Sequence, residues 1–140
     1  MLFGRRKPTI EVLKIKINVE HNDSTITIGG ESYTVITTGA SPMGSAEVHL
    51  VGFGRDILQI EALEILRQHG LRSCTFPQLT CMGKNPSFDI YCLGATLYHS
   101  DGRSPGHSFV AYQERKTGLS LRRSDFRTLF RWARVAAVEG

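Results

Sequence analysis

Three cysteines are the residues of this chain whose type most directly suggests metal or redox chemistry. Cys74 and Cys81 lie seven residues apart, and Cys92 follows eleven residues later. Structural zinc sites use ligand pairs at short spacing, so these spacings argue against zinc. Because cysteine is often buried as a small apolar side chain, we expect all three to be buried, unpaired and metal-free. We therefore expect neither a metal nor a cofactor.

A second candidate site lies in the polar segment HSDGRSPGH, residues 99–107. His99, Asp101 and His107 could form a facial metal site, or a base with its orienting carboxylate. The intervening serine, glycine and proline residues equally indicate a polar surface loop. The sequence contains no complete phosphate loop, dinucleotide fingerprint or serine nucleophile motif. We therefore expect a protein that is not an enzyme.

Nucleic-acid binding by the basic C-terminal segment is the main alternative. Residues 111–140 hold seven Lys and Arg against three Asp and Glu, whereas residues 1–110 hold ten of each. In LRRSDFRTLFRWAR, arginines that can pair with phosphates alternate with Phe126, Phe130 and Trp132, whose rings can stack on bases. The same stretch also fits a buried turn between strands, and the charge excess also fits a solvated face. Both interpretations stay open.

Length and composition fit one globular domain. The chain has 140 residues, of which 41% are hydrophobic and 21% charged. No apolar run approaches the roughly 18 residues that span a bilayer, and no apolar signal segment follows the charged N-terminus. An odd number of cysteines at irregular spacing suits a reducing compartment. We therefore expect a cytoplasmic protein with no membrane span.

The N-terminal segment is predicted to form a β meander. Residues 9–20 alternate between apolar and polar side chains, which is typical of a half-buried strand. Gly29 and Gly30 suit a two-residue hairpin turn between two further β-rich segments. The sequence thus predicts three strands within residues 9–38, and a domain boundary near residue 45 that separates residues 1–45 from 46–140.

A first helix is predicted over residues 57–69. Asp56 is placed to cap its first turn, and Gly70 is placed to end it. Apolar residues recur at helical spacing and predict a single face toward the core. These residues are Ile57, Ile60, Leu63 (with Ala62) and Leu66.

A second, shorter helix is predicted over residues 75–82. Thr75 can cap it, with Gln78 three residues later as a capping box requires. Pro77 lies in the first turn, where the missing amide hydrogen costs little.

The order of elements in the second half resembles the C-type-lectin-like fold. A strand at 47–53, two helices and several short strands match that order, and GLRSCTFPQL is similar to a Gly-x-Arg-Leu-Pro-Thr-x-x-Glu-Trp/Leu stretch. That stretch occurs in formylglycine-generating enzymes and in the variable proteins of diversity-generating retroelements. The residues that match this stretch are Gly70, Arg72, Thr75 and Leu79, and Gln78 takes the place of its Glu. The ending ARVAAV resembles the closing strand of these domains. The same half is also similar to small bacterial proteins of unknown activity.

The resemblance implies an α+β, C-type-lectin-like domain over residues 46–140, with the strand at 47–53 near the C-terminal strand at 134–138. The motifs of the enzymes and of the calcium-dependent sugar binders are missing from this sequence. The likeness therefore implies a scaffold for binding a protein or another macromolecule, with nucleic acid as the alternative partner. It also implies recognition by the late loops, residues 97–107, 113–118 and 122–132. The candidate binding residues are Tyr98, His99, Asp101, Arg103, His107, Arg122, Arg123, Asp125, Arg127 and Trp132.

Overall fold

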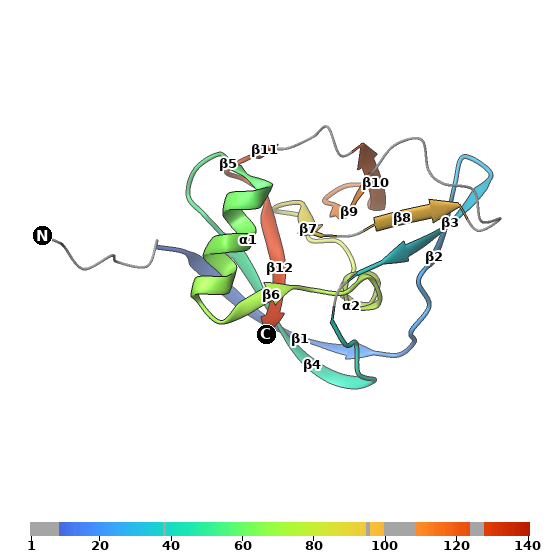
Figure 1. Cartoon of the computed structure of the whole chain (residues 1–140), viewed down its shortest axis with the longest axis horizontal. Helices are drawn as coiled ribbons and strands as arrows, with labels where there is room; N and C mark the ends of the chain where they lie inside the picture. Colours follow the sequence, from blue (N-terminus) through green and yellow to red (C-terminus); the bar gives the residue numbers. More distant parts are fainter. Residues whose placement is uncertain (1–8, 38, 95, 100–108, 124–127) are drawn as a thin grey trace, which may run out of the picture.

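The computed structural model describes residues 9–37, 39–94, 96–99, 109–123 and 128–140. Strands make up 48% of the structure and helices 15%, so the fold is largely β (Figure 1). The elements in chain order are β1 (Glu11–Val19), β2 (Thr25–Ile28), β3 (Glu31–Ile36), β4 (Gly44–Gly52), β5 (Ile57–Leu58), α1 (Gln59–Gln68), β6 (Leu71–Ser73), α2 (Phe76–Met82), β7 (Ile90–Cys92), β8 (Thr96–His99), β9 (Phe109–Glu114), β10 (Gly118–Arg123), β11 (Thr128–Leu129) and β12 (Arg134–Glu139).

A seven-stranded mixed sheet forms the centre of the molecule. Its strand order is β1–β4–β12–β7–β9–β10, and β6 joins it by pairing with β12. Strand β12 runs antiparallel to β4, with Val135 opposite Val51, and parallel to β7. The predicted closeness of the strand at 47–53 to the C-terminal strand is therefore confirmed. The C-terminal strand lies inside the sheet, between β4 and β7.

The middle strands β7 and β12 of the central sheet are buried on both faces, which explains their apolar sequences. Along β12, Ala136 and Val138 pack into one core cluster, while Val135 and Ala137 pack into another. Successive side chains of a strand point to opposite faces, so the two clusters lie on opposite sides of the sheet. Helix α2 contributes to the first cluster and α1 to the second. A strand covered on both faces has continuous apolar residues instead of alternating ones.

Two smaller sheets flank the central one. Strands β2, β3 and β8 form the first, and β5 pairs with β11 to form the second. Gly29 and Gly30 connect β2 to β3 with φ values of 59° and 81°, a conformation that glycine adopts without a steric penalty. The predicted hairpin turn is therefore confirmed.

The prediction of an α+β, C-type-lectin-like fold is wrong. Strands dominate the structure, and the two helices are short. The predicted N-terminal meander is also not a continuous unit, because β1 pairs with β4 over nine residues and β2 pairs with β3. Local alternation correctly identifies strands in this region, but it does not determine which strand pairs with which.

Helix α1 differs from its prediction in start, cap and buried face. It runs from Gln59 to Gln68, because Ile57 and Leu58 belong to β5. Asp56 therefore does not cap it; instead the Glu61 carboxylate accepts a hydrogen bond from the Leu58 backbone N at 3.4 Å. The buried residues are Ala62, Ile65 and Leu66, whereas Ile60 is 75% exposed and Leu63 is 37% exposed.

Helix α2 begins as the sequence predicted. The Thr75 hydroxyl accepts from the Gln78 backbone N at 3.4 Å, and the Gln78 side chain accepts from the Thr75 backbone N at 2.9 Å. Thr75 also donates to the Ser41 hydroxyl at 2.7 Å, and Phe76 N donates to Thr37 Oγ1 at 3.2 Å. These bonds connect α2 to the segment that follows β3.

Candidate binding surface

Two aromatic side chains lie exposed on the turn between β11 and β12. The rings of Phe130 and Trp132 stack with centroids 4.7 Å apart and an interplanar angle of 4°. Phe130 is 36% exposed and Trp132 is 52% exposed. Large aromatic side chains dominate interface energetics when they become buried, so an exposed stack is a candidate recognition feature.

Three backbone features hold the turn in place. The Ala133 backbone N donates to the Phe130 carbonyl at 2.9 Å and closes the turn. The Arg131 backbone N donates to Asp56 Oδ1, also at 2.9 Å. The next residue pair along β11 and β5 is Leu129 opposite Ile57, and both side chains are buried. The exposed rings therefore project from an anchored backbone.

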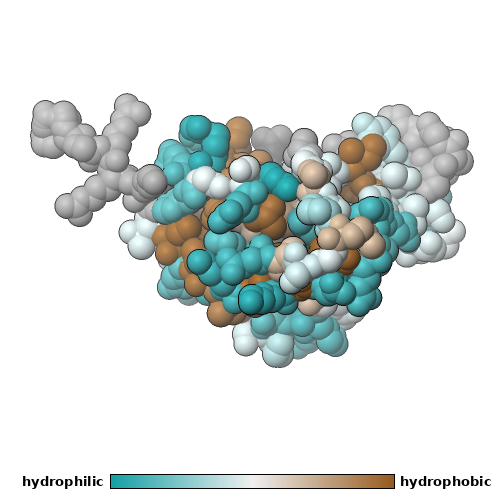
Figure 2. Space-filling model, turned by 90° about the horizontal axis from the view of Figure 1, so that it is seen from below, coloured by the Kyte–Doolittle hydropathy of each residue, from teal (hydrophilic) through white to brown (hydrophobic). Residues whose placement is uncertain are grey.

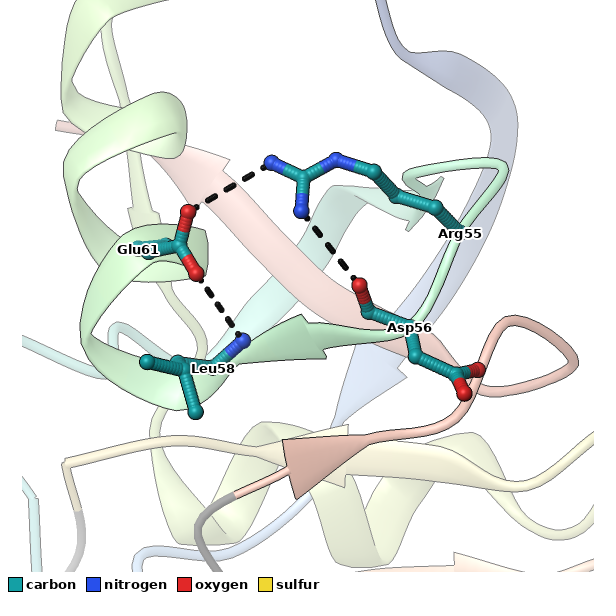
Figure 3. Close-up of polar contacts among 4 residues, drawn as sticks. All are labelled: Arg55, Asp56, Leu58 and Glu61. Carbon is teal, nitrogen blue, oxygen red and sulfur yellow. Dashed lines mark hydrogen bonds and ion pairs between the residues drawn. The ribbon is translucent and has the colours of Figure 1, made fainter.

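Asp56 connects the turn to the start of α1. Figure 3 shows its carboxylate pointing away from Arg55 and Glu61, on the side of the loop that leads into β12. The Arg55 guanidinium instead lies 3.5 Å from the Glu61 carboxylate, and Arg55 also donates to the Asp56 carbonyl. The residue that was predicted to cap the helix thus positions the aromatic turn.

Leu58 is exposed on β5, the strand that pairs with β11 just before the aromatic turn. Ile57 and Leu129 lie opposite each other and are buried, so Leu58 and its cross-strand partner Thr128 point to the other side. Leu58 is 45% exposed, and Arg131 is also exposed. We call Leu58, Phe130, Arg131 and Trp132 the aromatic surface.

A different face of the molecule has its apolar residues dispersed. Seen from the side on which Figure 1 places β1 and β4, apolar side chains are separated by hydrophilic ones (Figure 2). On β1, Val12 is 41% exposed and Leu13 is 50% exposed. Val12 and Leu13 are thus exposed to a similar extent as the residues of the aromatic surface, but they lie on a different element.

One C-terminal arginine has a structural role. Arg134 pairs with the Glu11 carboxylate at 3.2 Å and lies over the ring of Phe88, 5.2 Å from its centroid. It therefore links β12 to β1, and part of the basic excess of the C-terminal segment is neutralised within the molecule. Arg131 is the exposed cation next to the aromatic stack.

The predicted binding residues lie on several elements. Tyr98 and His99 belong to β8, and their backbones pair with Thr34 and Tyr33 of β3. Tyr98 is 43% exposed. Arg122 and Arg123 belong to β10, an edge strand of the central sheet, and Trp132 belongs to the aromatic surface. Outside the described residues lie Asp101, Arg103, His107, Asp125 and Arg127.

The cysteines differ in their environments. Cys74 and Cys92 are buried, as expected, whereas Cys81 is partly exposed. The Cys92 thiol donates to the Cys74 carbonyl at 3.1 Å. A hydrogen bond with the Cys92 side chain, and then burial, raise the pKa of the Cys74 thiol well above its ordinary value. In the part of the chain that the structure describes, no three His, Cys, Asp or Glu side chains lie where they could share a metal ion.

Sequence reasoning missed Leu58 as a surface residue and left the position of Phe130 open. Phe130 was interpreted as either a base-stacking residue or part of a buried turn, and the stack with Trp132 depends on the turn geometry. The available signal was the spacing of two aromatic residues across one arginine.

Within the described residues, neither helix is long and apolar enough to cross a membrane. No protein-family model, curated protein or solved structure matches the chain.

Proposed function

We propose that this chain is a non-enzymatic binding module that recognises another protein through the aromatic surface. The observation that supports this most directly is the exposed stack of Phe130 and Trp132 on an anchored turn. Tryptophan, tyrosine and arginine are the residues most enriched among interface hot spots. An aromatic pair that is already ordered loses little conformational entropy on binding.

The chemistry of the aromatic surface defines the kind of partner. Leu58 and Trp132 offer apolar area, and Arg131 offers a guanidinium that can pair bidentately with a carboxylate. The Arg55 guanidinium is occupied by Glu61, so the surroundings are of mixed charge. We therefore propose a protein segment with an apolar side chain to cover Trp132 and an acidic side chain for Arg131.

Comparative affinity purification tests the proposal. The tagged chain is isolated from its native cells as wild type, as Phe130→Ala/Trp132→Ala and as Val12→Ala/Leu13→Ala, and associated proteins are quantified by mass spectrometry. We expect a protein that associates with the wild type and the β1 variant but not with the aromatic variant. Equal recovery with all three forms would contradict the proposed surface. Circular dichroism of each form checks that folding is unchanged.

Nucleic-acid binding is the second candidate, favoured by the exposed Arg131, which lies in the sequence between two exposed aromatic residues. Bases stack on such rings while arginine pairs with phosphates. Trp132 is the single tryptophan, so its fluorescence reports binding of a single-stranded oligonucleotide of about 15 nucleotides. Quenching that weakens steeply as salt rises would identify this function. An unchanged emission spectrum at low salt would contradict nucleic-acid binding.

A further inference from the structure

A cavity of about 470 Å³ lies between β1 and the last turn of α2. It contains a thiol, an imidazole and an ammonium group from separate elements. The polar residues that line it are Lys16, Asn18, Glu20, His21, Thr80 and Cys81. The cavity shares no residue with the aromatic surface, so any chemistry here is additional to the proposed recognition.

The hydrogen bonds of His21 determine which ring nitrogen carries its proton. The Asp23 backbone N donates to Nδ1 at 3.2 Å, so Nδ1 acts as an acceptor. The neutral imidazole therefore carries its hydrogen on Nε2. This nitrogen lies 3.5 Å from Thr80 Oγ1 and 3.8 Å from Cys81 Sγ.

Thr80 and Cys81 both offer an acceptor to the Nε2 hydrogen of His21. The Thr80 hydroxyl donates its own hydrogen to the Pro77 carbonyl at 2.9 Å, so Oγ1 can only accept from the imidazole. Cys81 Sγ is the second acceptor within reach of Nε2. An N–H directed at the sulfur stabilises the thiolate, which is the nucleophilic form of cysteine.

Cys81 differs in accessibility from the other two cysteines. It is partly exposed and lines the cavity, whereas Cys74 and Cys92 are buried in the core. Buried structural thiols are inert toward reagents in solution, while exposed thiols near hydrogen-bond donors react. The chain therefore contains two internal controls for the reactivity of Cys81.

Lys16 is the residue of the cavity that can pair with an anionic ligand, and Glu20 adds a carboxylate to the same lining. Lys16 lines the cavity and is exposed, and among the described residues no ion pair involves it. Lys14 lies two residues earlier on the same strand and pairs with Glu47 at 4.0 Å. A carboxylate on a molecule that approaches Cys81 would meet the Lys16 ammonium group.

We propose that Cys81 forms a mixed disulfide with a low-molecular-weight disulfide that carries carboxylates. The Cys81 thiolate attacks one sulfur of the incoming disulfide, and a new S–S bond forms as the old one breaks. The second half of the reagent leaves as a thiolate and takes a proton from water. The Cys81 sulfur rises by one oxidation unit and the departing sulfur falls by one, so the exchange balances without a further oxidant. Lys16 orients the carboxylates, and His21 holds the attacking thiolate.

Two disulfide reagents test this assignment on the folded chain. Oxidised glutathione carries carboxylates, and bis(2-hydroxyethyl) disulfide is uncharged. Intact mass and peptide mapping should find one adduct on Cys81 that dithiothreitol reverses, and none on Cys81→Ser. Lys16→Gln should slow the reaction of Cys81 with oxidised glutathione about two- to fivefold at low salt, the range for an exposed ion pair. It should leave the uncharged reagent unaffected, and Lys14→Gln should change neither rate.

The His21 variants separate hydrogen bonding from folding. His21→Ala should slow both reagents between about twofold and tenfold, the scale of one hydrogen bond. His21→Gln retains an N–H donor and should recover part of the rate. An adduct that forms on Cys74 or Cys92 at a similar rate would overturn the proposal. So would equal effects of Lys16→Gln on both reagents.

Discussion

At the residue scale, the molecule keeps its only tryptophan largely outside the core. Trp132 is 52% exposed although tryptophan gains more free energy from burial than most side chains. Its neighbour Ala133 is buried, so the backbone turns the large ring outward and the small residue inward. The ring therefore contributes little to the core, which supports the proposed role of Trp132 in recognition.

Thr75 is a residue whose role the sequence identified correctly. Its hydroxyl both caps α2 and donates to Ser41, and the residue is 2% exposed. Thr75→Ala should lower the free energy of unfolding by about 1–2 kcal/mol, the usual cost of a lost cap and a buried hydrogen bond. Urea denaturation measures this. Ser32→Ala, on an exposed strand position, should change it by less than about 0.5 kcal/mol; equal effects would contradict the capping role.

Glu114 should make stability depend on acid pH. Its carboxylate accepts from the Thr117 hydroxyl at 2.7 Å and from the backbone N of Thr117 and Lys116. The Thr117 hydroxyl, and then these amides, lower the pKa of Glu114 below its ordinary value. A lowered folded-state pKa stabilises the fold above the unfolded-state pKa, and this contribution is lost as pH falls through the lower, folded-state value.

An NMR titration of Glu114 measures this effect. Thr117→Val removes the hydroxyl, so the pKa of Glu114 should rise toward the ordinary value. Thr117→Ser keeps the hydroxyl and should leave the pKa near that of the wild type. If the valine variant titrates like the wild type, the hairpin hydrogen bond is not the cause.

At the scale of elements, the local sequence indicated whether a segment is a helix or a strand better than it indicated which strands pair. The residues around α1 contain two apolar stripes at helical spacing, and the sequence does not state which one meets the sheet. The structure buries Ile65 and Leu66 and exposes Ile60. Strands β5 and β11 have two residues each, too few for any alternation to be recognised. The aromatic surface depends on this short pair, so its geometry was not predictable from sequence.

Asp56 should control the order of the aromatic turn. Asp56→Ala removes the acceptor of the Arg131 amide, so Trp132 should gain rotational freedom. The steady-state anisotropy of tryptophan fluorescence should therefore fall. Arg55→Ala is the matched control, because it breaks the pair with Glu61 and leaves the turn hydrogen bond in place. Equal anisotropy in the Asp56 variant and the wild type would show that the turn is held by other contacts.

At the scale of the whole molecule, one sheet brings distant segments together. Strand β12 joins the N-terminal half through β4 and the late strands through β7, and helices α1 and α2 contribute to opposite faces. The approach of β4 and β12 was predicted as part of the resemblance to the C-type-lectin-like fold, and it is found although that fold class is wrong. The sequence did not predict that β1 would pair with β4, since long-range pairing depends on the complete sheet. The central claim is that this scaffold presents the aromatic surface to a protein partner.

Site-specific photocrosslinking in the native cells tests that claim most directly. A photoreactive benzophenone amino acid replaces Trp132 in one form of the chain and Leu13, which is 50% exposed on β1, in the other. We expect a crosslinked protein of defined mass from position 132 that is displaced by an excess of the unlabelled wild-type chain, and none from position 13. The same products from both positions, or no displaceable product from position 132, would contradict the account.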